Sequence, residues 1–238
     1  MTEIMYDYHT YILKPLQNIN KLSTIPGLKV DKPRRVSTMD ITINRYREIW
    51  YNFYRWQHEL NTIYKFSLAI SFALLTGLLA QFRFYLPLSP VPITGQTFAV
   101  LLAGVLLGRW GGVSLGLYVG LGAMGIPWFA SISSGLYYLL GPTGGYLIGF
   151  IFASFFLGYM IDKHLWSHSF HGILGLMFLA NFLLIYIPGL IVLYLWTGGT
   201  SIVSLLTIGL LPFIPGDITK IIAASTIAYS ILPREMIE

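Results

Sequence analysis

An aspartate and a lysine stand three positions apart in an apolar C-terminal stretch of the chain. Asp217 and Lys220 are the only Asp, Glu, Lys or Arg residues between positions 165 and 232. Spacing i, i+3 places two side chains on one face of a helix, so this acid and base can neutralise each other or bind one polar ligand together. Inside a bilayer an unpaired charge costs about 3 kcal/mol or more, so both side chains need partners there.

Two interpretations of this pair are open at the level of sequence. In the first, Asp217 and Lys220 bind a ligand, because an ionisable pair at membrane depth is by default a candidate functional site. In the second, the pair is structural: Asp217 follows Pro215-Gly216, caps a helix that restarts there and forms an ion bridge with Lys220. The two interpretations are compatible, since an unliganded site can rest with the pair closed on itself.

The composition of the chain indicates a membrane protein. Of the 238 residues, 55% are hydrophobic and 11% are charged, whereas soluble domains carry about 25% charged residues. Nine of the fifteen lysines and arginines lie in residues 1–62. Because this basic segment precedes the first apolar span, it favours contact with anionic lipid over nucleic-acid binding.

The apolar segments predict six transmembrane helices, over about residues 63–82, 94–108, 110–125, 143–161, 170–196 and 201–232. A straight spanning helix needs about 20 residues, so the short, glycine-rich second and third segments predict tight packing or distorted helices. Proline disrupts a helix, so we expect a kink at Pro188-Gly189 and a break at Pro212, Pro215 and Gly216. Irregular backbone at membrane depth must be buried in protein or line a cavity.

The distribution of charge predicts three regions. They are a basic, aromatic-rich cytoplasmic or interfacial segment (1–62), a membrane domain (63–232) and a short cytoplasmic tail (233–238). Arg109, Lys163 and Arg234 fall on the side of the basic segment and Arg83 alone on the other, so both termini are predicted to be cytoplasmic. Residues 40–65 alternate aromatics with arginines, as in an interfacial amphipathic helix; a partner-binding helix is the alternative.

Five short motifs follow one another along the apolar part of the chain. They are residues 90–104 (PVPITGQTFAVLLAG), 108–109 (GR), 122–127 (GAMGIP), 140–146 (LGPTGGY) and 212–220 (PFIPGDITK). In composition and order they resemble BioY proteins, the biotin-binding S components of energy-coupling-factor (ECF) transporters. The resemblance covers about residues 63–232. It implies an all-α integral membrane protein, a six-helix S-component bundle that binds the vitamin near its outer face.

The resemblance also implies a substrate site. Asp217 and Lys220 would be polar contacts to biotin, whose ureido ring has two N–H donors and a carbonyl and whose side chain ends in a carboxylate. Ser133 falls where the family commonly has an asparagine in a glycine-rich loop, and a hydroxyl offers fewer hydrogen bonds than an amide. Gln96 and Tyr146 stand near span ends and are further candidates for the pocket, with packing or an interface as the alternative.

A stripe of small residues on the first span suggests how transport is powered. Ala69, Ala73 and Gly77 recur at every fourth position, which allows another helix to approach closely. In S components a similar stripe docks the coupling subunit; packing within the chain is the alternative. No Gly-Lys dipeptide occurs, so a Walker P-loop is absent. Energy is therefore expected from partners, an ECF coupling subunit and two ATPase subunits.

The histidines offer no metal site in this interpretation. His164, His168 and His171 could share a helix face, but they lie at a predicted cytoplasmic turn and are expected to be exposed to solvent. The sequence thus predicts a multi-pass subunit of the cell membrane that captures biotin and has no catalytic residues, metal or cofactor. The alternatives are an S component for another small vitamin and an intramembrane enzyme, which the single membrane acid disfavours.

Overall fold

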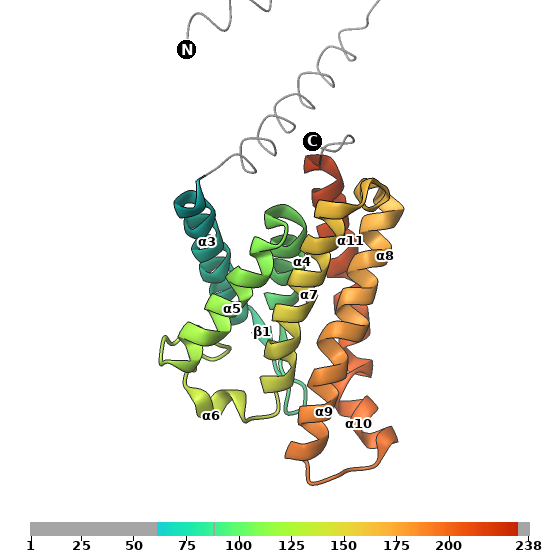
Figure 1. Cartoon of the computed structure of the whole chain (residues 1–238). Helices are drawn as coiled ribbons and strands as arrows, with labels where there is room; N and C mark the ends of the chain where they lie inside the picture. The colour runs from blue at the N-terminus through green and yellow to red at the C-terminus, as the bar shows by residue number, and fades with distance from the viewer. Residues whose placement is uncertain (1–60, 88, 233–238) are drawn as a thin grey trace, which may run out of the picture. The chain divides into compact units, whose positions relative to one another are not determined.

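Helices form most of the chain that the computed structural model describes, residues 61–87 and 89–232 (Figure 1). Within these residues the helices begin with α3 (Thr62–Gln81). A two-stranded antiparallel hairpin, β1 (Arg83–Phe84) and β2 (Ile93–Thr94), leads from it into the bundle. The helices that follow are α4 (Gln96–Leu107), α5 (Trp110–Ala123), α6 (Leu136–Leu139), α7 (Gly144–Lys163), α8 (Phe170–Leu179), α9 (Tyr186–Trp196), α10 (Ile202–Gly209) and α11 (Ile214–Ile231).

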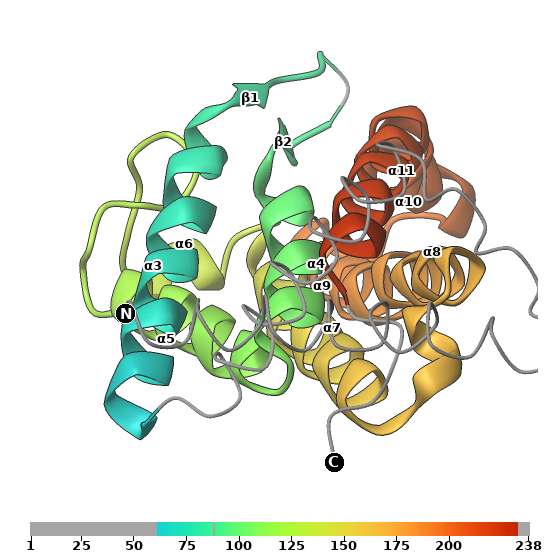
Figure 2. The ribbon, with the colours of Figure 1, turned by 90° about the horizontal axis from the view of Figure 1, so that it is seen from above.

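The core of the bundle is built around α4. Seen from above, this helix lies among α3, α5, α7 and α11 (Figure 2), and it packs against all four. Its sequence is apolar all round, and a helix of that kind is expected to be buried; ten of its twelve residues are buried. A Cβ on Gly104 would stand 2.7 Å from the Ser154 carbonyl oxygen, so glycine is what lets α4 and α7 approach so closely.

The turn between α4 and α5 depends on a glycine with positive φ. Gly108 has φ of 58°, a left-handed conformation that commonly ends helices because glycine lacks a Cβ. The Asp162 carboxylate, from the end of α7, lies against this glycine and accepts hydrogen bonds from the backbone N–H (3.2 Å) and Nε (3.4 Å) of Arg109. The carboxylate therefore leaves no room for a side chain at position 108.

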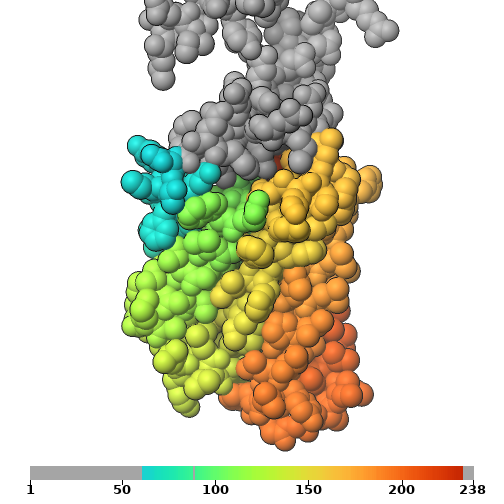
Figure 3. All heavy atoms as spheres, viewed as in Figure 1, coloured from blue at the N-terminus to red at the C-terminus, as the bar shows by residue number. Residues whose placement is uncertain are grey.

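A π-helical segment, Ala180–Ile185, joins α8 to α9. The three parts form one helix over Phe170–Trp196, and its atoms lie beside those of α7 on the face drawn in Figure 3. Proline lacks an N–H, so Pro188 cannot donate to the carbonyl four residues back and disturbs the α-helical ladder just before it. The expected distortion is present, but it lies N-terminal to Pro188-Gly189 as a π-turn.

The last helical segment breaks at Pro212, as predicted, whereas Pro215 and Gly216 lie inside the helix that follows. Helix α10 ends at Gly209, Leu211–Phe213 form a 3₁₀ turn, and α11 begins at Ile214. Asp217 therefore lies in the first turn of α11 instead of capping it, and the capping position belongs to Phe213. The prediction that Asp217 caps the restarted helix is wrong, because Pro215 is accommodated inside the first turn, where an N–H is not needed.

Four helices within the described residues are long and apolar enough to cross a membrane: Thr62–Gln81, Gly144–Lys163, Phe170–Trp196 and the broken Ile202–Ile231. Helices α4 and α5 have 12 and 14 residues, fewer than the about 20 that a straight span needs. The chain is thus a mostly helical, multi-pass membrane protein. The predicted 1–62 segment lies outside the described residues apart from its last two, and so does the tail at 233–238.

Candidate functional site

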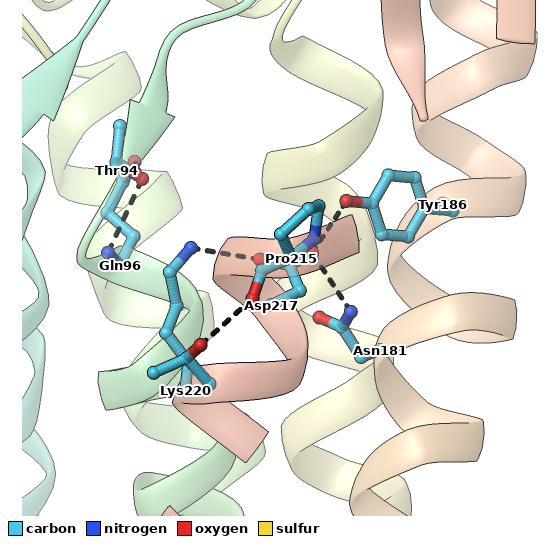
Figure 4. A network of polar contacts seen from close by, with 8 residues as sticks. Thr94, Gln96, Asn181, Tyr186, Pro215, Asp217 and Lys220 are labelled. Carbon is cyan, nitrogen blue, oxygen red and sulfur yellow. Dashed lines mark hydrogen bonds and ion pairs between the residues drawn. The ribbon is translucent and has the colours of Figure 1, made fainter. Parts of the chain in front are cut away.

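Asp217 and Lys220 form a closed ion pair inside the bundle. Oδ1 of Asp217 accepts a hydrogen bond from Nζ of Lys220 at 2.9 Å. Asp217 is 3% exposed, and Lys220 is half-buried. Both project from the first turns of α11 toward the other helices (Figure 4). A charge-assisted bond of this kind is strong where water is excluded, so each residue provides the partner that the other requires.

The second carboxylate oxygen of Asp217 has two further donors. Oδ2 accepts from the Tyr186 hydroxyl at 2.6 Å and from Nδ2 of Asn181 at 3.0 Å. Sequence reasoning missed both residues. A signal was present: Asn181 is the only asparagine after position 61, and a polar amide within a long apolar span requires an explanation.

At the helix break, two backbone carbonyls accept hydrogen bonds from side chains of other elements. Oγ of Ser89, which precedes β2, donates to the Ile208 carbonyl at 2.6 Å. The Tyr146 hydroxyl, near the start of α7, donates to the Gly209 carbonyl at 2.8 Å. These bonds replace helical ones and make irregular backbone acceptable at membrane depth. Tyr146 thereby connects α7 to the end of α10.

We expect Tyr146→Phe to lower the stability of the fold by about 1–3 kcal/mol, because the Gly209 carbonyl would remain buried without its donor. Thermal unfolding of the purified protein in detergent measures the effect. Thr226→Val is the control, because the Thr226 hydroxyl bonds only within its own helix, to the Ile222 carbonyl, on an exposed position. Equal melting temperatures for Tyr146→Phe and the unaltered protein would show that this bond does not stabilise the break.

A cavity brings four of the predicted site residues together: Gln96, Tyr146, Asp217 and Lys220. Its other walls are apolar and aromatic, with a few hydroxyls: Val91, Pro92, Thr94, Thr97, Ala130, Tyr138, Thr143, Leu147, Phe150, Ile185, Tyr186 and Phe213. Tyr138 comes from the short helix α6, and burial raises the pKa of its phenol above the ordinary value. Apolar walls with a few polar groups are typical of ligand sites.

Gln96 is held by protein partners at the edge of this cavity. Its Nε2 donates to the Tyr118 hydroxyl at 2.7 Å, and its Oε1 accepts from the Thr94 hydroxyl at 2.9 Å. In Figure 4, Thr94 and Gln96 lie on the opposite side of Lys220 from Tyr186 and Asn181. The geometry therefore supports both interpretations of Gln96, a structural amide and a group that borders the cavity.

Ser133 is not among the residues that line the cavity. Its hydroxyl donates weakly to the Ser131 carbonyl at 3.5 Å, and its own carbonyl accepts from the Phe129 N–H. The neighbouring Ala130 reaches the cavity instead. The loop turns back on itself through Ser131 and Ile132, which both have positive φ. Because of this turn, Ser133 does not line the cavity.

The small-residue stripe faces the inside of the bundle. Ala69 and Ala73 are 0% and 1% exposed, and the Ala69 carbonyl accepts from the Ser114 hydroxyl of α5 at 2.7 Å. A Cβ on Gly77 would stand 3.0 Å from Cβ of Trp128. Close packing of α3 against this same chain therefore favours the alternative, packing within the chain, and a partner interface at Ala69, Ala73 and Gly77 stays a prediction.

One histidine also departs from expectation. His168 is 5% exposed, and its Nε2 lies 2.9 Å from the Ile161 carbonyl oxygen. It therefore belongs to the packed turn after α7, and the prediction that it is exposed to solvent is wrong.

The fold and the cavity define a class: a helical, multi-pass membrane protein with a buried ion pair in a recess between its helices. The family model that matches residues 55–235 is that of the BioY family. The chain belongs to the BioY family.

Named relatives and a solved structure agree with this membership. The chain is 54% identical over 140 residues to the probable biotin transporter BioY of Methanothermobacter thermautotrophicus, covering 56% of this chain and 89% of that protein. It is 38% identical over 152 residues to the biotin transporter BioY of Thermotoga maritima, covering 63% and 86%. The crystal structure of the S-component for biotin from an ECF-type ABC transporter superposes with a TM-score of 0.65 and 26% identity, over 71% of this chain and 93% of that one.

Proposed function

We propose that this protein is the membrane subunit that captures biotin for uptake across the cell membrane. The observation that carries the proposal is the Asp217–Lys220 pair, which lines a cavity in a chain whose relatives are named biotin transporters. Similarity to a solved biotin S-component supports the same substrate.

The chemistry of biotin matches the side chains around the cavity. Its ureido N–H groups are donors suited to a carboxylate such as Asp217, and its carbonyl or carboxylate oxygens are acceptors suited to the Lys220 ammonium. The thioether ring would lie against apolar walls such as Leu147 and Phe150. We propose Asp217 and Lys220 as direct contacts, with Gln96 and Tyr146 bordering the ligand.

We further propose that six segments cross the membrane, with α4 and α5 as the two short ones. Their burial among longer helices supports this count, because lipid need not cover them. The excess of Lys and Arg on the side of the N-terminal segment supports cytoplasmic termini. We retain the division into residues 1–62, 63–232 and 233–238 as part of the proposal.

Transport would be energised by partners, a coupling subunit and two ATPase subunits of the ECF type. This is supported by the absence of a P-loop from the sequence and by the S-component relative. The protein itself would be no enzyme: Asp217 has no second carboxylate beside it, since Asp162, near the end of α7, is the only other Asp or Glu within residues 61–232. Paired carboxylates for acid–base work are therefore missing from this part of the chain.

Equilibrium binding of labelled biotin to the purified protein tests the proposal. We expect saturable binding that unlabelled biotin displaces and that thiamine and riboflavin do not. Displacement by either of these vitamins instead would favour an S component for another vitamin. Absence of saturable biotin binding in well-folded protein would overturn the proposal.

A further inference from the structure

Two neutral donors converge on a single oxygen of Asp217. Tyr186 and Asn181 both bond to Oδ2, at 2.6 and 3.0 Å, whereas Lys220 bonds to Oδ1. Asn181 is fully buried and does not line the cavity. Its amide oxygen has no hydrogen-bond partner among the described residues, so the bond to Asp217 is what orients this amide. The two oxygens of one carboxylate thus have different neighbours.

The π-helical segment is what lets one helix supply both donors. Residues five apart in an α-helix point about 140° away from each other. In a π-turn the hydrogen bond runs from i to i+5, and here the Tyr186 backbone N–H donates to the Asn181 carbonyl. Residues 181 and 186 therefore lie one turn apart on the same face, toward α11. Without the extra residue in this turn, only one of them could reach Asp217.

We infer that Asn181 and Tyr186 are positioning residues that hold Oδ2 of Asp217, so that Oδ1 is the oxygen that bonds a donor of the ligand. The inference rests on the proposed function, since it specifies which atom of the site meets the ureido N–H. When the Lys220 ammonium turns to an acceptor of the ligand, the carboxylate keeps two donors and stays oriented. Tyr186 also lines the cavity, and its hydroxyl is engaged with Asp217.

Infrared difference spectroscopy tests the bond without any ligand. The carboxylate stretching band of Asp217 is assigned by its disappearance in Asp217→Asn. Tyr186→Phe should shift this band while the protein keeps its fold, because the ring still stacks on Phe182 and packs against Tyr146. Tyr146→Phe is the matched control: it lines the same cavity, but its hydroxyl bonds Gly209, so the band should not move. An unshifted band in Tyr186→Phe would overturn the inference.

Biotin binding provides the second measurement. Tyr186→Phe and Asn181→Leu should each weaken biotin binding roughly tenfold or more, as expected for a lost hydrogen bond to a charged group. Tyr194→Phe, on the same helix α9 but outside the cavity, should bind as the unaltered protein does. Asn181→Leu also removes the buried Asn181 amide oxygen, which has no hydrogen-bond partner within the described part of the chain. A loss of binding in this variant therefore cannot be attributed to a new unsatisfied group at position 181.

Combined variants test whether Tyr186 acts through Asp217. In an Asp217→Asn background, Tyr186→Phe should have a much smaller effect on biotin affinity and on thermal stability than it has alone. The effects of two residues that act through one another are not additive. Biotin affinity is measured at high ligand concentration in these variants. Fully additive losses would mean that Tyr186 acts independently of Asp217 and would overturn the inference. If the band shifts but the unaltered protein binds no biotin, the positioning role stands and the proposed substrate fails.

Discussion

Lys220→Met should abolish biotin binding and destabilise the protein, and adding Asp217→Asn should restore the fold without restoring binding. The single change leaves the Asp217 carboxylate, 3% exposed, without its counter-ion, and breaking a buried pair in this way costs about 3–5 kcal/mol. The double change removes both charges, which is often nearly neutral for stability. Biotin then lacks both charge-assisted bonds.

Labelled-biotin binding and thermal unfolding of the single and double variants, side by side, provide the measurement. A double variant that regains stability and also binds biotin with unchanged affinity would show that the pair is structural and not a ligand site. Lys163→Met is a suitable control, because it removes an exposed lysine at the end of α7, where its ammonium bonds the Tyr159 hydroxyl away from the cavity. It should leave both readouts unchanged.

Ala73→Trp is expected to prevent stable folding, whereas Leu74→Trp is expected to be tolerated. The two residues are neighbours on α3, but Ala73 is 1% exposed and Leu74 is 51% exposed. An indole in the buried stripe would overpack the contact between α3 and the rest of the bundle. At position 74 the indole would replace the exposed leucine side chain, so one exposed apolar side chain would take the place of another.

Yield of monodisperse protein, melting temperature and biotin binding distinguish these variants. The buried position predicts that Ala73→Trp loses all three together, and that Leu74→Trp keeps them. If Ala73→Trp were folded and bound biotin normally but failed in ATP-dependent uptake, the stripe would serve a partner after all. In that case α3 would have to detach from α5 during docking.

The long helices could be predicted closely from hydropathy alone. Spans expected at 63–82 and 143–161 correspond to Thr62–Gln81 and Gly144–Lys163, because an apolar run bounded by polar or glycine-rich turns marks where a helix begins and ends. The hairpin of β1 and β2 was not foreseen, since two-residue strands carry no periodic signal. The use of the small-residue stripe could not be decided either, because close packing requires the same residues whichever helix is the neighbour.

The contacts of the candidate site could be predicted only in part, for a similar reason. Asp217 and Lys220 are conspicuous because they are charged residues in an apolar segment, and their bond follows from local i, i+3 spacing. The bonds from Asn181 and Tyr186 join residues more than thirty positions away, and they depend on a π-turn whose register sequence does not reveal. Ser133 was assigned by similarity of position, but two residues with positive φ redirect the loop.

The closed Asp217–Lys220 pair makes ligand binding an exchange of partners instead of a simple addition. The carboxylate and the ammonium already bond at 2.9 Å, so an incoming molecule must replace that bond at both ends. A molecule that offers an acceptor to Lys220 but no donor to Asp217 would leave an oxygen of the buried Asp217 carboxylate without its bond. Sites built on such hydrogen bonds reject analogues lacking one group by large factors. In the proposed site, the resting pair would thus discriminate among vitamins without any steric barrier.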